Sequence, residues 1–413
     1  MRSSWPWRPI GELFEIGTGK TMSAAARNGP KKTPFLRTSN VLWDEIDLTS
    51  VDEMTIPEYE LPDKLLRRGD LLVCEGGEIG RAAIWNGEFE TIAFQNHIHR
   101  LRPRVPNVMP RFYVYFLQSA FTQLGIFEGV GNKTTIPNLS RGRLTTLHVP
   151  QPTIDEQQAI VNTLSRVRRA IKLQNRIAMV VQELKQAVTS TTLRIGLRNE
   201  SIKETTIGPM PRSWEPKSVL DLCGILSGGT PRKSVAHYWD GDIPWVSGIE
   251  LKSSVIKETR FRITWEGVEA GSRVAPAGSV MLLVRGMGLA NDLPVAVIKR
   301  QMAFNQDVKA LVPRGTYSGD FIRAAIYAGK ERLLSQVVPS AHGTLTMQLR
   351  DIATLCIPCP SDPQEADEIV SIVDTIQRKS DVHQQLVGTL QVLFESLLYR
   401  LMTRDLAASE IEL

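Results

Sequence analysis

Apolar residues recur at alternating steps of four and three in two long segments of the chain. The first segment follows Pro152, after which the sequence has neither glycine nor proline for more than forty residues. This period is typical of a helix whose apolar stripe packs against a partner helix. The second segment repeats the same phase 209 residues later. The stripe positions are Ile160, Leu164, Val167, Ile171, Gln174, Ala178, Val181, Lys185 and Val188, and then Ile369, Val373, Ile376, Ser380, His383, Val387, Leu390, Phe394 and Leu397.

The charges of the two segments support mutual pairing as a coiled coil. Residues 166–198 hold eight Lys and Arg against one Glu, whereas residues 365–405 hold seven acidic against four basic residues. Opposite charges suit partner helices, although a solvated basic face is the alternative for the first segment. Gln174 and His383 occupy equivalent stripe positions, where polar residues often fix register, and this interpretation is favoured over a metal-binding role for His383.

The globular parts of the chain are also duplicated, with an offset that stays within a residue or two of 209. Residues 5–21 align with residues 214–230, and the stretch Ala93–Ile98 aligns with Ala303–Val308. Short β-type runs such as 71–73, 280–284 and 295–298 are bounded by Gly and Pro, and a helical stretch, Phe112–Phe121, interrupts them. We therefore expect two copies of a mixed α/β unit with a largely antiparallel sheet, each followed by a long helix.

Two short motifs imitate chemical sites. Gly19-Lys20-Thr21 ends like a phosphate-binding loop, but the first glycine of that motif would fall on Phe14, so ATP binding is not favoured. Cys356 and Cys359 have the C-x-x-C spacing of a redox or zinc site, but no second Cys or His pair follows. Reduced thiols on an apolar strand ending at Pro360 are the better interpretation.

Composition indicates an ordinary soluble globular protein. The chain has 413 residues, 42% of them apolar and 23% charged, and no apolar run approaches the ~20 residues that span a bilayer. The N-terminus has no apolar core of the signal-peptide kind, so we expect a cytoplasmic protein without a membrane partner. The net charge of +5 and the pI near 9.0 favour a polyanionic partner.

Local motifs resemble those of specificity subunits of Type I restriction-modification systems, and the resemblance covers nearly the whole chain. Lys20 departs from the Gly-Thr-Pro continuation of that family, and Gln364-Glu365-Ala366 departs from its Glu-Gln-Gln. The motifs are Gly-Asp-Leu-Leu at 69–72, IPNLS at 136–140, VPQPTIDEQQAIV at 149–161, Gly-Gly-Thr-Pro at 228–231 and Pro-Trp-Val-Ser-Gly at 244–248.

This resemblance implies an α+β fold in which two repeated mixed α/β target-recognition domains are separated by two long helices that pair as an antiparallel coiled coil. Each recognition domain would read one half of a split target in double-stranded DNA. The helices would act as a ruler and as a dock for two methyltransferase subunits, with motor-nuclease subunits added. The implied segments are 1–152 (first recognition domain), 153–205 (first spacer helix), 206–361 (second recognition domain) and 362–413 (second spacer helix).

The resemblance implies no chemistry for this chain, so no catalytic and no metal-binding residue is expected. S-adenosylmethionine, ATP and Mg would be bound by the partner subunits. The sequence has no Asn- or Asp-Pro-Pro-aromatic loop of an adenine methyltransferase. Asp242, Glu250 and Lys252 imitate a nuclease pattern, but the aligned stretch of the first half lacks any acid.

Five loop regions at matching places in both halves carry the side-chain types that contact DNA. Arg and Lys recognise guanine, Asn and Gln recognise adenine, and Ser, Thr and backbone groups mostly hold phosphates. The predicted DNA-binding residues are Lys20, Thr21, Arg37, Ser39, Asn40, Arg81, Asn96, Asn132, Lys133, Thr134, Thr230, Arg232, Lys233, Ser247, Arg285, Met287, Asn305, Gln306, His342 and Thr344.

Two alternative functions remain open at this point. One is a scaffold or anti-restriction protein that keeps the docking helices without DNA recognition. The other is the specificity subunit of an orphan methylation system that has no nuclease partner.

Overall fold

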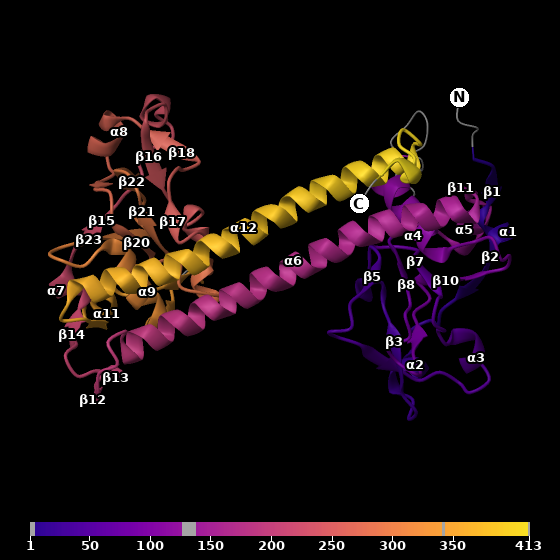
Figure 1. Ribbon diagram of the computed structural model, residues 1–413, viewed down its shortest axis with the longest axis horizontal. Helices are drawn as coiled ribbons and strands as arrows, with labels where there is room; N and C mark the ends of the chain where they lie inside the picture. Colours follow the sequence, from indigo (N-terminus) through magenta and orange to yellow (C-terminus); the bar gives the residue numbers. More distant parts are fainter. Residues whose placement is uncertain (1–4, 126–137, 341–342, 412–413) are drawn as a thin grey trace. The chain divides into compact units, whose positions relative to one another are not determined.

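The computed structural model describes residues 5–125, 138–340 and 343–411 (Figure 1). The chain divides into two compact units: unit 1 comprises Met1–Asn175 and Gln385–Leu413, and unit 2 comprises Arg176–Gln384. Two long helices, α6 (Ile154–Ile195) and α12 (Pro363–Met402), each contribute one end to either unit.

The helices α6 and α12 pack antiparallel in each unit, as predicted. In unit 1 the guanidinium of Arg168 lies 4.9 Å from the ring centroid of Phe394. In unit 2 the Lys185 ammonium donates to the Gln377 side chain, and Arg198 binds Glu368 at 2.6 Å. Residue numbers thus rise along α6 as they fall along α12. Every predicted stripe position is buried or half-buried, which confirms the seam.

The predicted pairing of charges between the two helices holds only in part. Arg198 at the end of α6 does bind Glu368 of α12. However, Lys172 pairs with Glu45 at 2.9 Å, and Arg168 lies 4.0 Å from Asp44, so these cations bind the globular part of unit 1. The basic side chains of α6 therefore also attach this helix to the globular part of unit 1.

The helix of the first spacer segment is shorter than the predicted range 153–205. The helix α6 ends at Ile195 because Gly196 follows with a φ of 67°, a left-handed conformation that suits glycine at a helix end. Residues 202–205 form β12 (Ile202–Thr205), which pairs antiparallel with β13 (Gly208–Pro211). The predicted boundary at residue 205 therefore falls within a β-hairpin.

Unit 1 is built on a four-stranded sheet of order β2-β10-β7-β8 and a three-stranded sheet of order β6-β3-β9. All four residues of β7 are buried, since α4 packs on one face and a second apolar cluster containing Trp85 packs on the other. The elements of unit 1 other than α6 and α12 are β1 (Trp7–Pro9), α1 (Ile10–Leu13), β2 (Phe14–Thr18), α2 (Ala24–Asn28), β3 (Thr33–Leu36), η1 (Thr38–Asn40), β4 (Val41–Leu42), β5 (Glu45–Ile46), β6 (Asp52–Met54), α3 (Leu61–Lys64), β7 (Leu71–Cys74), β8 (Ala82–Ile84), β9 (Ala93–Phe94), β10 (Ile98–Pro103), α4 (Pro110–Thr122), α5 (Arg141–Thr146), β11 (His148–Pro150) and η5 (Ala408–Glu410).

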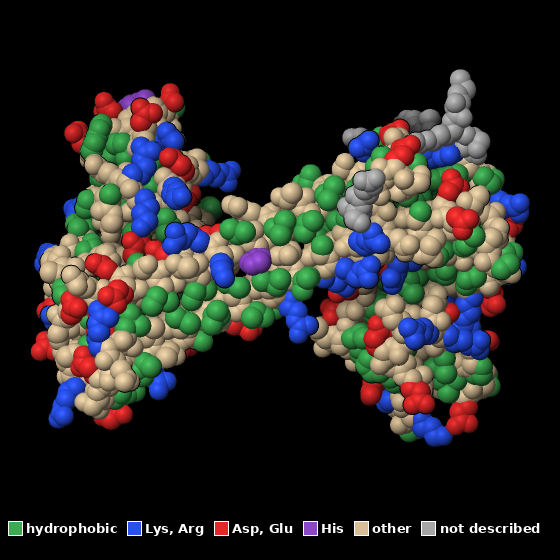
Figure 2. Space-filling model, in the orientation of Figure 1, with side chains coloured by type: hydrophobic (Ala, Val, Ile, Leu, Met, Phe, Trp, Pro, Cys, Tyr) green, Lys and Arg blue, Asp and Glu red, His purple; other side chains and the backbone are tan. Residues whose placement is uncertain are grey.

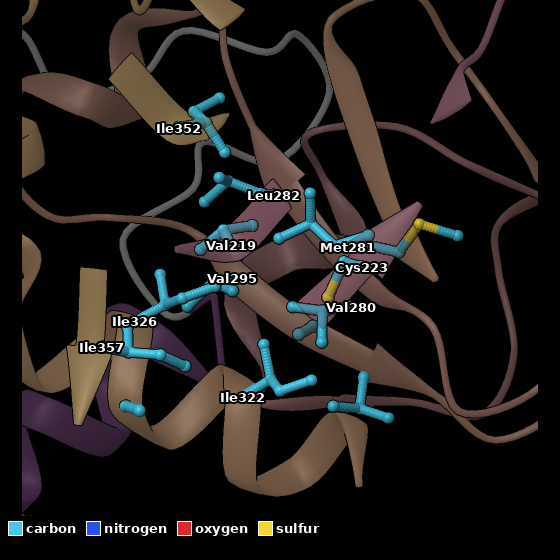
Figure 3. Close-up of a cluster of buried hydrophobic side chains, with 14 of the residues drawn as sticks. Val219, Cys223, Val280, Met281, Leu282, Val295, Ile322, Ile326, Ile352 and Ile357 are labelled. Atoms are coloured by element: carbon cyan, nitrogen blue, oxygen red, sulfur yellow. The ribbon is translucent and has the colours of Figure 1, made fainter. Parts of the chain in front are cut away.

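Unit 2 repeats this plan with a five-stranded sheet of order β15-β23-β20-β21-β17 and a four-stranded sheet of order β18-β16-β22-β19. Figure 3 shows its core, in which strand residues such as Val280 and Leu282 and helix residues such as Ile322 and Ile326 point toward one another. The elements of unit 2 other than α6, α12, β12 and β13 are β14 (Glu215–Ser218), α7 (Val219–Leu222), β15 (Cys223–Ser227), η2 (Ala236–Trp239), β16 (Ile243–Val246), η3 (Glu250–Lys252), β17 (Val255–Ile256), β18 (Phe261–Ile263), α8 (Trp265–Glu269), β19 (Val274–Ala275), β20 (Val280–Leu283), η4 (Met287–Ala290), β21 (Val295–Ile298), β22 (Met302–Phe304), β23 (Val308–Pro313), α9 (Gly319–Ala328), α10 (Lys330–Leu334), β24 (Val338–Pro339), β25 (Leu345–Thr346), α11 (Leu349–Ala353) and β26 (Cys356–Cys359).

The strand pairing confirms a largely antiparallel mixed α/β architecture in both units. The parallel pairs among the described strands are β3 with β9, β16 with β22 and β17 with β21. The predicted helix at 112–121 lies within α4, and α9 takes the equivalent place in unit 2.

A tryptophan–glutamate hydrogen bond joins the entry strand of each unit to the start of a long helix. The Trp5 indole donates to Glu156 at 3.4 Å in unit 1, and the Trp214 indole donates to Glu365 at 3.0 Å in unit 2. Both pairs are 151 residues apart in sequence, so the repeat preserves the bond. Glu365 is buried and also accepts a 2.6 Å hydrogen bond from the backbone N–H of Leu197.

Replacing Glu365 should destabilise unit 2 more than replacing Glu156 destabilises unit 1. Glu365→Ala leaves two buried N–H groups without an acceptor, at a cost of about 1–3 kcal/mol each. We expect the unfolding temperature of the full chain to fall by several degrees for Glu365→Ala, and by less for the matched Glu156→Ala, in calorimetric scans. Equal effects of the two substitutions would contradict this account.

Candidate nucleic-acid interface

The sheet topology of unit 2 brings the predicted loop regions to one edge of its five-stranded sheet. The strands β15 and β20 both end at this edge, and β23, which lies between them and runs antiparallel to both, begins there. The loops 228–234, 284–294 and 305–307 therefore emerge side by side. We call these loops, together with residues 343–347, the edge loops of unit 2.

Direct contacts connect the edge loops of unit 2. The Thr230 hydroxyl donates to the Gln306 side-chain carbonyl at 2.6 Å. Arg285 forms a backbone bridge with Thr346, and the N–H of Gly286 donates to the carbonyl of Leu345 at 3.0 Å. The predicted residues Thr230, Arg285 and Gln306 thus belong to one surface, although they lie in separate parts of the sequence.

The predicted residues on the second sheet of unit 2 adjoin this surface, but two of them are committed to the fold. Asn305 is buried and accepts from the N–H of Asp307 at 3.1 Å, while its own N–H donates to the carbonyl of Val246 at 2.9 Å. Ser247 is buried and its hydroxyl donates to Glu250 at 2.8 Å. Both residues shape the loops that carry their exposed neighbours.

Exposed side chains of the edge loops supply the free positive charge of unit 2. Arg232, Lys233, Arg285 and Met287 are all exposed, and Thr344 is half-buried. The three cations have no ion-pair partner among the residues that the structure describes. Their charge is therefore available to an anionic ligand.

Unit 1 repeats the convergence at the corresponding edge of its four-stranded sheet. The strands β2 and β7 end where β10 begins, so the loops 19–23, 75–81 and 95–97 emerge together. Lys20 bridges to Gln95, and the N–H of Asn96 donates to the carbonyl of Lys20 at 3.0 Å. The predicted region at 37–40 joins them, because an N–H of the Arg81 guanidinium donates to the carbonyl of Thr38 at 3.2 Å.

The predicted cations that the structure describes in unit 1, unlike those of unit 2, are held in ion pairs. Lys20 binds Glu60 at 2.7 Å, and Arg81 binds Glu78 at 2.8 Å. Arg37 binds Asp52 at 3.0 Å, although its side chain is exposed. A nucleic-acid phosphate would have to compete with these carboxylates.

Other predicted residues of unit 1 differ in how accessible they are. Thr21 and Ser39 are exposed, and Asn96 is half-buried. Asn40 is buried; its side chain accepts from the N–H of Arg37 at 2.8 Å and donates to the carbonyls of Asp47 and Ser50. Asn40 therefore has a structural role in shaping this loop.

The predicted residues Asn132, Lys133, Thr134 and His342 lie outside the described residues. The segment that follows the first three is attached to the edge of unit 1. The buried imidazole of His99 contacts the carbonyl of Leu139 at 2.8 Å, and the N–H of Leu139 donates to the carbonyl of Glu75 at 2.8 Å. Burial lowers the pKa of His99, so the imidazole stays neutral near pH 7.

Equivalent glycines explain the stretch that imitates a phosphate-binding loop. A Cβ on Gly19 would lie 2.2 Å from the carbonyl oxygen of Phe94, and one on Gly228 would lie 2.3 Å from that of Phe304. The next residue in each loop, Lys20 or Gly229, donates its N–H to that same carbonyl at 2.9 Å. These glycines let the first edge loop of each unit pack directly against the neighbouring sheet.

The sequence patterns missed Lys309, which follows the predicted region 305–307 on β23. Its ammonium donates to the Ser227 hydroxyl at 2.9 Å, and it has no carboxylate partner among the described residues. Partial burial and the neighbouring Arg285 guanidinium lower the pKa of Lys309. A single lysine at the start of an apolar strand gave little signal, because the strand partner Ser227 becomes visible only in the fold.

The Cys356–Cys359 motif lies on β26, as predicted for an apolar strand. Both thiols are free, Cys359 is buried, and burial raises its pKa to about 12. Within residues 5–125, 138–340 and 343–411, no group of three or more His, Cys, Asp or Glu side chains is placed to hold a metal ion.

The sequence matches the family described as "Type I restriction modification DNA specificity domain" at residues 2–183 and again at residues 211–391. The chain belongs to this family. The two matches correspond to the two halves of the repeat, so each half carries one specificity domain.

Curated relatives are specificity subunits of Type I restriction enzymes. The MjaIX specificity subunit of Methanocaldococcus jannaschii is 28% identical over 206 residues, which cover 47% of this chain and 46% of that protein. The EcoR124I/EcoR124II specificity subunit of Escherichia coli is 23% identical over 211 residues, which cover 50% of this chain and 52% of that protein. Each of these matches therefore spans about half the length of the relative.

Solved structures share the fold of this specificity-domain chain. A chain from a study of complex assembly and conformational transition in the type I R-M system gives a TM-score of 0.61 at 16% identity, covering 97% of this chain and 98% of that chain. The S subunit of a Type I restriction-modification system from M. genitalium gives a TM-score of 0.56 at 15% identity, covering 97% and 96%. The predicted α+β fold with two long paired helices is thereby confirmed.

The basic and acidic side chains of the two specificity domains are interspersed on the face drawn in Figure 2. None of the described helices is long and apolar enough to cross a membrane.

Replacing Lys309 should test whether the edge loops of unit 2 bind DNA phosphates. Lys309→Met removes one cation that has no carboxylate partner and should weaken DNA binding similarly for all sequences. The slope of log affinity against log salt concentration should fall in magnitude by about one. Fluorescence anisotropy of the full chain across a salt series measures both quantities, and an unchanged slope would exclude a phosphate contact.

Proposed function

We propose that this chain is the sequence-specific DNA-recognition subunit of a Type I restriction-modification enzyme, and that each unit reads one half of a bipartite target in double-stranded DNA. The observation that carries the proposal is that, among the described residues, predicted loop regions converge at one sheet edge in both units. Each converging set lies in one of the two specificity-domain matches. Loops on a rigid sheet edge can differ in sequence while the sheet holds them in place.

The side chains of the edge loops fit the chemistry of base and phosphate contact. Arg285 can donate two hydrogen bonds to a guanine edge, and Gln306 can pair with adenine in the major groove. Lys233 and Lys309 carry charge suited to phosphates. In unit 1, Arg37 and Arg81 would exchange their carboxylate partners for DNA, so we expect unit 2 to contribute more of the salt-dependent affinity.

The long helices are proposed to dock two methyltransferase subunits. Large apolar side chains that face solvent on α6 and α12 support this proposal, because exposed apolar patches often mark protein interfaces. Motor-nuclease subunits would join the assembly, and the partners would hold S-adenosylmethionine, ATP and Mg. The chain itself would contribute recognition and no catalytic group. The exposed side chains are Leu173, Met179, Val180 and Leu184 on α6 and Val382, Leu386, Val392 and Leu393 on α12.

Genome-wide mapping of methylated adenines with and without this gene tests the proposed function. A split motif that is methylated only when the gene is present would support recognition by this chain. Unchanged methylation would favour a scaffold or anti-restriction protein. A split motif without cleavage of unmodified DNA would identify an orphan methylation system.

Arg285→Gln should reduce discrimination at one half-site only. Each unit has its own edge loops, and one good bidentate base contact contributes about 1–3 kcal/mol of discrimination, or about 5-fold to 150-fold in affinity. The matched control is Arg300→Gln, since Arg300 is also exposed but binds Glu258 at the opposite end of β21. Binding to DNA libraries randomised at each half-site measures the effect. Equal loss at both half-sites would contradict the assignment.

Lengthening both helices should lengthen the unread spacer of the DNA target. Seven residues added after Asn175 in α6 and after Gln385 in α12 keep the heptad phase and extend each helix by about 10 Å. DNA rises roughly 3.4 Å per base pair, so the spacer should grow by about three pairs. Methylation mapping would show both half-sites unchanged in sequence. An unchanged spacer, or altered half-sites, would exclude a ruler role for the helices.

A further inference from the structure

Unit 2 contains a cavity of about 540 Å³ that meets its edge loops only at residues 292–294, the end of the loop 284–294. Its walls come from α6, α12, α9 and the segments 251–254 and 292–295. Ligand-binding cavities commonly have volumes of about 300–1,000 Å³. Polar and charged groups dominate this one, including Lys185, Arg323 and Ser380.

Arg323 on α9 lines the cavity as a buried cation without a partner. Its side chain belongs to a residue only 6% exposed, and its Nε has no hydrogen-bond partner. The guanidinium forms no hydrogen bond or ion pair with any of the described residues. A buried guanidinium is costly unless an anion or several hydrogen bonds compensate for its desolvation. Asp320 and Asp374 attract the Arg323 guanidinium, but neither forms a direct ion pair with it.

A second cation, Lys185 on α6, lies near Arg323 on the cavity wall. Its ammonium donates only to the neutral Gln377 side chain among the described residues. Burial first, and then the positive charge of Arg323, lower the pKa of Lys185. Two neighbouring cations that repel each other make the cavity favourable for an anion.

Carboxylates near the cavity attract these two cations, but none forms a direct hydrogen bond or ion pair with them among the described residues. Asp292 accepts from Lys330 and from Tyr327, both at 2.8 Å. Asp381 accepts from the Gln377 amide at 2.7 Å. Asp320 binds Lys299 at 2.8 Å, and Asp374 makes no hydrogen bond with either cavity cation.

Unit 1 has large side chains at several of the corresponding positions. Tyr115 donates to Asp44 at 2.8 Å, and the ring of Phe394 packs under Arg168. A valine, Val114, stands where unit 2 has Arg323. The repeat thus pairs a closed site with an open one on the same framework. In the alignment of the halves, Trp43, Asp44, Tyr115, Arg168 and Phe394 correspond to Ser253, Ser254, Ala324, Gln377 and Lys185.

We propose that the cavity of unit 2 binds a small molecule that carries a phosphate or carboxylate group. The guanidinium of Arg323 would pair with the oxyanion, because its planar donors match two oxygens at once. Lys185 adds a second positive charge, and the hydroxyls of Ser253 and Ser254 offer neutral hydrogen bonds to the rest of the ligand. This site is independent of the proposed DNA recognition.

Titration calorimetry of the full chain with inorganic phosphate and with citrate tests the proposal, at constant ionic strength maintained with sodium chloride. We expect saturable binding of at least one anion at one site. Arg323→Met should weaken it by at least about tenfold, the loss expected for one charge-assisted contact. Ala324→Tyr, which introduces the side chain of unit 1, should abolish it. Arg300→Gln, which removes an exposed guanidinium of the same unit, should leave it unchanged.

Thermal unfolding provides a second readout for the same proteins. Without added anion, Arg323→Met should unfold at the same or a higher temperature than the parent chain, since it removes a buried charge that lacks a partner. The bound anion should raise the unfolding temperature of the parent chain but not that of Arg323→Met. Lys185→Met serves as a second variant and should also lose most of the anion effect.

Several outcomes would overturn the proposal. Absence of saturable binding by the parent chain would mean that the cavity holds water only. Binding that survives in Arg323→Met, Lys185→Met and Ala324→Tyr would place the anion elsewhere. A large loss of stability in Arg323→Met without anion would show that the guanidinium serves the fold. The phosphate and citrate arms identify which oxyanion the site prefers.

Discussion

The antiparallel packing of α6 against α12 closes the hydrophobic core of each unit. In unit 1, Ile160 and Leu164 of α6 and Leu398 and Leu401 of α12 join one buried cluster with the sheet. In unit 2, Leu193 of α6 and Ile369 of α12 likewise join the buried cluster that contains the sheet residues. The core of unit 1 therefore needs two separate stretches of sequence, whereas the core of unit 2 lies within the single stretch Arg176–Gln384. Separating the helices would expose apolar surface in both units, at about 25 cal/mol for each Å².

Much of this fold could be predicted, because its strongest signals are periodic or repeated. The apolar stripe with alternating steps of four and three residues predicted both long helices. Its recurrence after 209 residues supported the prediction in each half. Short strands such as β7 and β21 were visible because Gly and Pro bound them. The end of α6 was predicted too late, since the single Gly196 was a weaker signal than the polar residues that continue beyond it.

The candidate site was predictable as a set of loops but not as a set of available side chains. Spacing alone placed Lys20 among the DNA contacts, but its partner Glu60 lies 40 residues away and is brought near only by the fold. Asn40 has the right chemistry for adenine, but its amide already donates hydrogen bonds to backbone carbonyls of its own loop. The sequence patterns missed Lys309 because its availability as a cation depends on the residues that the fold places around it.

The two halves of the repeat share the same buried contacts but differ in the side chains exposed on their edge loops. The tryptophan–glutamate bonds and the glycines at 19 and 228 recur at matching positions in both units. In contrast, the edge cations are ion-paired in unit 1 and free of carboxylates in unit 2, among the described residues. A framework held by a few buried contacts leaves the remaining positions able to diverge without loss of fold.

The assignment of residues 385–413 to unit 1 has a consequence for synthesis of the chain on the ribosome. The globular part of unit 1 is made first, but Leu398 and Leu401, which complete its core, emerge only after the whole of unit 2. Until then the side of α6 that packs against α12 in unit 1 has no partner helix. Unit 2 can therefore finish folding before unit 1, and the first half to be translated is the last to mature.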